Sequence, residues 1–139
     1  MGEFSIWHWL VVAILLLGMY VPFIFYILSL QRALESIDQT LRPVSPGLAW
    51  LLLIPLFNFI WIFFLVVWIS KGYEKMWELQ RLKAQSSAGF GVGIAYSVCW
   101  VLCLIPGLNL LVLIPSLVLW ILHWVQVSQA RKLVLQEST

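Results

Sequence analysis

The longest uncharged stretch of the chain, residues 89–127, constrains the fold more than any other feature. It contains 39 residues and no Asp, Glu, Lys or Arg. As one α-helix it would measure about 58 Å, roughly twice the thickness of the hydrocarbon core of a bilayer. The stretch must therefore fold back on itself, and Pro106-Gly107-Leu108-Asn109 has the composition of a turn. Two embedded helices are expected, at residues 89–105 and 108–127.

Two more apolar stretches precede this one. Residues 6–30 would reach about 37 Å as a helix, enough to cross a bilayer with some tilt. Residues 47–70 are also long enough for one span. Pro55 and Asn58 lie near the middle of this second stretch, where proline removes a backbone donor. The second stretch is therefore expected to be a kinked span, and the alternative is a re-entrant hairpin made of two short arms.

Composition places these stretches in a membrane. Hydrophobic residues make up 63% of the chain and charged residues 10%, against roughly 45–50% and about 25% in soluble domains. A chain of 139 residues forms one domain. The fold class expected is therefore an all-α integral membrane protein, one polytopic domain over residues 1–139 with four embedded helices. The net charge of +2 is too small to indicate a nucleic-acid partner.

The distribution of positive charge predicts the orientation. With four spans, the N-terminus, the amphipathic loop 71–88 and the C-terminal tail share one side of the membrane. That side would carry six of the eight basic residues: Lys71, Lys75, Arg81, Lys83, Arg131 and Lys132. Because positive residues favour the cytoplasm, the loop and both termini are expected there. The re-entrant alternative instead places the N-terminus outside and all eight basic residues inside. Segment length favours four spans, whereas charge favours the alternative.

Several polar residues lie inside the embedded stretches. The candidates for lining a polar path are Asn58, Ser97, Asn109, Ser116, His123 and Gln126. His8 and His123 lie in similar tryptophan-containing strings and would share a depth if both termini were on one side. They are interpreted as interfacial histidines, with a shared metal or haem site as the alternative. No metal or other cofactor is predicted.

Small residues form a ladder on the third predicted helix. The candidates for close helix packing are Gly89, Gly91, Gly93 and Ala95. Residues of this size let helices approach closely in lipid, where no hydrophobic force draws helices together. The ladder therefore predicts either a seam within the monomer or an interface between subunits.

Two resemblances are visible. Residues 46–61, which begin Pro46-Gly47-Leu48-Ala49-Trp50, together with residues 91–96 resemble a group of small uncharacterised bacterial inner-membrane proteins. This resemblance implies a bacterial inner-membrane location and a fold of a few helices. The first ten residues are similar only to the start of the small subunits of the twin-arginine translocase. The hinge and the lysine-rich helix of that family are missing here, so protein translocation is not carried over.

The embedded stretches contain no ionisable acid or base other than histidine, cysteine and tyrosine. Ion-coupled transporters and proton pumps normally keep charged residues in their pathway. The sequence also contains no phosphate-binding glycine loop, and an enzyme is not expected. The function predicted is a scaffold or accessory subunit of a membrane complex, with other membrane subunits or a second copy as partners. The alternative is a passive homo-oligomeric channel or small-molecule carrier.

Overall fold

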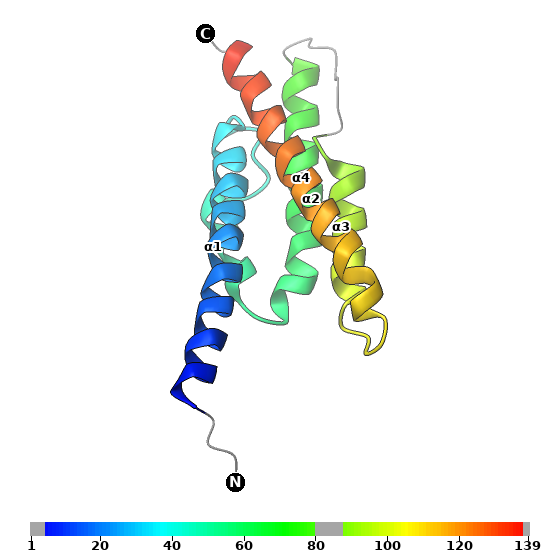
Figure 1. The fold of residues 1–139 in the computed structure, drawn as a ribbon. Helices are drawn as coiled ribbons and strands as arrows, with labels where there is room; N and C mark the ends of the chain where they lie inside the picture. The colour runs from blue at the N-terminus through cyan, green and yellow to red at the C-terminus, as the bar shows by residue number, and fades with distance from the viewer. Residues whose placement is uncertain (1–4, 80–87, 138–139) are drawn as a thin grey trace.

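The computed structural model describes residues 5–79 and 88–137, and these residues form helices and no strand. Figure 1 shows the helices packed side by side. The elements are α1 (Ile6–Ser36), η1 (Pro46–Leu53), α2 (Phe57–Leu79), α3 (Phe90–Leu102) and α4 (Asn109–Glu137). Helices α1, α2 and α4 are long and apolar enough to cross a membrane, and α3 is apolar but shorter. The prediction of an all-α chain with membrane-compatible helices is confirmed.

The prediction of one span over residues 47–70 is not confirmed. The chain forms η1, leaves helical geometry at residues 54–56, and starts α2 at Phe57. Leu56 has a φ of 65°, and the N–H of Asn58 donates to the carbonyl of Ile54 at 3.0 Å. In Figure 1 the chain descends along α1 through η1 and rises again through α2. The direction of the chain therefore reverses at Pro55, which cannot continue the hydrogen-bond ladder of a helix.

Helix α1 is continuous and longer than the predicted segment 6–30. Pro22 lies inside it without ending it. The extra turns reach Ser36, where Arg42 folds back and donates from its guanidinium to the carbonyls of Glu35 and Ile37, both at 3.0 Å. These bonds satisfy carbonyl groups that the end of a helix leaves without partners.

The turn predicted at residues 106–109 is present. Helix α3 ends at Leu102, Gly107 has a φ of 88°, and α4 starts at Asn109. Helix α4 also continues ten residues past the predicted end at residue 127. Ala130 and Val134 in this extension are buried, so one of its faces packs against the rest of the molecule.

The core lies at one end of the molecule. It forms where the second half of α1, η1, α2, α3 and α4 pack together, and its largest buried side chains include Tyr26, Leu30, Ile69 and Tyr73. The hydroxyl of Tyr73 contacts Ser36 at 2.8 Å and donates to the carbonyl of Ala33 at 3.1 Å. These bonds join α2 to the last turns of α1.

The basic side chains of the described residues also lie at one end of the molecule. The described basic residues lie near the C-terminal ends of α1, α2 and α4 or in the connection after α1: Arg32, Arg42, Lys71, Lys75, Arg131 and Lys132. The ends of these three helices point the same way in Figure 1, and the start of α1 lies at the opposite end of the molecule. Of the predicted loop 71–88, residues 71–79 belong to α2, whereas residues 80–87 lie outside the described residues.

Candidate functional site

A buried polar and aromatic cluster lies where α1, α3 and α4 meet. His123 on α4 is 1% exposed, and its Nδ1 lies 2.9 Å from the hydroxyl oxygen of Tyr26 on α1. Either the phenol donates to Nδ1 or the Nδ1–H donates to the phenol oxygen, depending on the tautomer of the imidazole. A polar group buried this deeply is costly without such a bond. The pair therefore holds α1 and α4 in one register.

Aromatic rings enclose this hydrogen bond. The ring of Tyr96 on α3 stacks on His123 with centroids 6.5 Å apart and planes 19° apart. Trp120 and Trp124 meet the Tyr26 ring edge-on at 5.6 and 6.1 Å. The indole N–H of Trp124 donates to the hydroxyl of Ser29 at 2.8 Å, which adds a second polar link between α4 and α1.

Gly93 provides the space for His123. A Cβ on Gly93 would lie 2.6 Å from Cγ1 of Val66 and 2.7 Å from Nε2 of His123. Any larger residue would therefore push against α2 and α4 together. Gly89 is also constrained, because its φ of 79° is left-handed and its Cβ would lie 3.1 Å from Oε1 of Gln126.

The four predicted packing residues differ in their surroundings. Gly89 and Gly93 face other helices of the same chain, whereas a Cβ on Gly91 would meet nothing within 4 Å. Ala95 is half-buried. The ladder therefore supplies a seam inside the monomer at Gly93, and Gly91 lies on an open face.

The two histidines do not meet. His8 is exposed near the start of α1, and Tyr26, the partner of His123, lies 18 residues further along the same helix. That separation is about 27 Å along the helix axis, so the alternative of a shared metal or haem site is wrong. Nε2 of His123 faces Gly93. Within residues 5–79 and 88–137, no three His, Cys, Asp or Glu residues lie close enough to hold a metal ion.

The remaining polar candidates are spread through the fold. Ser97 is fully buried and donates to the carbonyl of Gly93 at 2.8 Å, and Ser116 is 2% exposed. Asn58 is half-buried at the start of α2. Asn109 is exposed at the start of α4, and its Oδ1 accepts from the N–H of Leu110 at 2.8 Å.

Half-buried Gln126 lies 17 residues after Asn109 on α4, which corresponds to about 25 Å. The six polar candidates therefore do not form one compact site. Those that the fold buries, Ser97, Ser116 and His123, are packed inside the monomer.

Reasoning from sequence missed Tyr26, Ser29 and Tyr96 as members of the cluster. The available signal was the phenol itself, because a tyrosine in an apolar run needs a partner for its hydroxyl. The partner could not be identified in this way, since His123 is 97 residues from Tyr26 along the chain.

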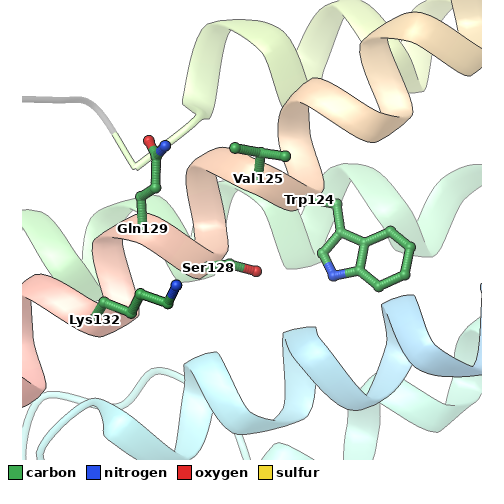
Figure 2. Close-up of a pocket in the computed structure, with 5 residues that line it drawn as sticks. All are labelled: Trp124, Val125, Ser128, Gln129 and Lys132. Atoms are coloured by element: carbon green, nitrogen blue, oxygen red, sulfur yellow. The ribbon is translucent and has the colours of Figure 1, made fainter.

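A second polar feature is a shallow hollow of about 280 Å³ at the surface of α4. It is lined by Trp124, Val125, Ser128, Gln129 and Lys132. Figure 2 shows Lys132 extending along α4 toward Ser128, whose hydroxyl points toward the indole of Trp124. The hollow lies at the charged end of the molecule and joins an apolar wall to an ammonium group. Comparison with family models, with curated proteins and with solved structures found no match for this chain.

Proposed function

We propose that the protein is a non-enzymatic membrane scaffold or accessory subunit that binds a transmembrane helix of a partner along the first half of α1. The observation that carries the proposal is the exposure of that half-helix. From Ile6 to Val21 every side chain is exposed except Val12, which is half-buried. Ile6, Leu17 and Met19 are 79%, 64% and 71% exposed.

The contrast within α1 is sharp. Its second half contributes Tyr26, Leu30 and Leu34 to the core, whereas its first half is exposed and its start extends beyond the ends of the other helices in Figure 1. The exposed part would be about 24 Å long. A helix that is apolar on all sides suits a membrane, and a neighbouring helix can supply packing that its own chain does not.

The proposed topology follows from helix lengths measured from the charged end. The rise from Ile6 to Arg32 in α1 is about 39 Å, and from Asn109 to Arg131 in α4 about 33 Å. Both distances exceed a hydrocarbon core of about 30 Å. From Phe57 to Lys71 the rise is only about 21 Å. Helices α1 and α4 are therefore assigned as spans. The uncharged residues 89–108, which include α3, return the chain to the start of α4, and the reversal at Pro55 makes η1 with α2 a re-entrant hairpin.

This arrangement reverses the expected position of the N-terminus. All the described basic residues lie at one end, which the positive-inside rule assigns to the cytoplasm. The N-terminus is then outside and the C-terminus inside, in the bacterial inner membrane that the resemblance of residues 46–61 suggests.

Cysteine labelling tests this topology. In a background without Cys99 and Cys103, an impermeant maleimide added from outside should label Ser5→Cys and leave Thr40→Cys unlabelled in intact cells. Permeabilisation should then expose Thr40→Cys. The opposite pattern would restore four full spans.

The partner is tested by a photocrosslinking scan over each position from Ile6 to Val21 in native membranes. A partner helix should give one discrete adduct whose yield rises and falls every three to four positions, because only one face of α1 would touch it. Leu111 and Ile114 of α4, 77% and 69% exposed, serve as controls and should not give this adduct.

Uniform yields along α1, matching the two controls, would mean that this half-helix faces lipid alone and would contradict the proposal. An adduct of twice the monomer mass of 16.0 kDa would identify a second copy as the occupant. That result would favour the homo-oligomeric channel or carrier, which flux measurements in liposomes would then test.

A further inference from the structure

The hollow beside Trp124 has the geometry of a site for a lipid headgroup. Trp124, Ser128 and Lys132 are spaced four residues apart and so share one face of α4. They span two helical turns, about 12 Å along the axis. A volume of about 280 Å³ is many times the space that one bound water needs. The hollow is therefore large enough for a phosphate with its attached ester oxygens.

The position of the hollow along α4 agrees with a site at the membrane interface. Helix α4 carries no charge from Asn109 to residue 130, and Arg131 and Lys132 are its first basic residues. Trp124 therefore lies in the uncharged part of α4, two turns before Lys132, which lies where the charged part of the helix begins. Tryptophan and lysine prefer these two levels of a bilayer interface.

The side chains that line the hollow suit an anionic ligand. The five described residues that line the hollow include one cation and no carboxylate. Figure 2 shows the Ser128 hydroxyl between the Lys132 ammonium and the Trp124 indole. Trp124 is held in place by its bond to Ser29 at 2.8 Å. Its ring therefore forms a fixed apolar wall beside two hydrogen-bond donors.

We propose that this hollow binds the phosphate of an anionic phospholipid. Lys132 and Ser128 donate to the phosphate oxygens, and the indole of Trp124 packs against the glycerol and the first methylene groups of an acyl chain. The proposal rests on membrane insertion as proposed above and does not depend on a partner for α1.

The test follows the reactivity of Lys132 toward an amine-acylating reagent, measured by peptide mass spectrometry on the full chain. Lys75 is an exposed lysine of α2 and lies at the same end of the molecule as Lys132. It is therefore the matched control within the same molecule. Vesicles containing phosphatidylglycerol should slow the acylation of Lys132 at least fivefold more than that of Lys75, relative to phosphatidylcholine vesicles. Ser128→Ala should reduce this difference while leaving both charges in place.

Binding is measured separately by native mass spectrometry. Lys132→Gln should lower retention of phosphatidylglycerol about fivefold, and Lys75→Gln should lower it less than twofold. Equal protection of the two lysines, or equal loss of lipid in the two variants, would overturn the proposal. Protection by inorganic phosphate in neutral detergent to the same extent would assign the site to a soluble anion and would also overturn it. Flotation with vesicles reports membrane insertion independently, so a failure of insertion is recognised as such.

Discussion

Replacing Gly93 by alanine tests whether the seam between α2, α3 and α4 sets the stability of the fold. The added Cβ would lie 2.6 Å from Cγ1 of Val66 and 2.7 Å from Nε2 of His123. Both distances are too short for non-bonded atoms, so the neighbours must move. The Val66 methyl can shift by side-chain rotation, whereas the imidazole is held by its hydrogen bond to Tyr26. Overpacking of this kind costs about 1 to 3 kcal/mol.

Gly91→Ala is the matched control. It lies two residues away in the same helix, and its Cβ would meet nothing within 4 Å. Both substitutions gain up to about 1 kcal/mol of helix propensity, so this contribution cancels between them. Gly93→Ala should therefore be less stable than Gly91→Ala by about 1 to 3 kcal/mol.

The measurement is reversible unfolding of each variant in mild detergent, followed by circular dichroism. Adding Val66→Ala to Gly93→Ala should show favourable coupling of at least about 0.5 kcal/mol in a double-mutant cycle, because it removes one of the two clashing groups. If Gly93→Ala unfolds at or above the midpoint of Gly91→Ala, the seam does not have the close packing described here.

Three further changes probe single interactions. Tyr26→Phe leaves Nδ1 of His123 without its partner and should lower the free energy of unfolding by about 0.6 to 2 kcal/mol, measured by denaturant unfolding. Tyr73→Phe removes two bonds to the end of α1 and should increase amide hydrogen exchange in the last turn of α1 more than elsewhere. The backbone N–H of Thr40 lowers the pKa of Asp38 below its ordinary value, with the Thr40 hydroxyl adding to the effect. A lowered pKa stabilises the fold above about pH 3.9. This contribution is lost as the pH falls through the folded-state value. The melting difference between the parent and Asp38→Ala should therefore be largest near pH 7 and should shrink as the pH falls below about 3.9, and a difference independent of pH would contradict this role.

The sequence by itself determined the class of the fold and the position of the turn between α3 and α4. Residues 89–127 are too long for one helix in a bilayer, and the proline and glycine near their middle leave one place to reverse, where the structure reverses. The fold class and this turn depend on segment length, hydrophobicity and local backbone chemistry. They can therefore be predicted without knowing which other segments of the chain pack against them.

The tertiary structure decided the path of residues 46–70. A run of this length is compatible with one span or with a hairpin, and the hydropathy of the two is the same. The chain reverses at Pro55, with η1 packed against α1, and a contact between separate segments cannot be calculated from either segment alone.

The same reason explains the buried cluster. Gly91 and Gly93 belong to two neighbouring series of small residues on the same predicted helix, yet only Gly93 lies against Val66 and His123. Which member of a ladder is buried depends on the rotation of α3 about its own axis. Likewise, the partner of Tyr26 lies 97 residues away and is fixed by the crossing of α1 and α4. Sequence identified the residues that need partners, and the packing of the helices determined which partners they have.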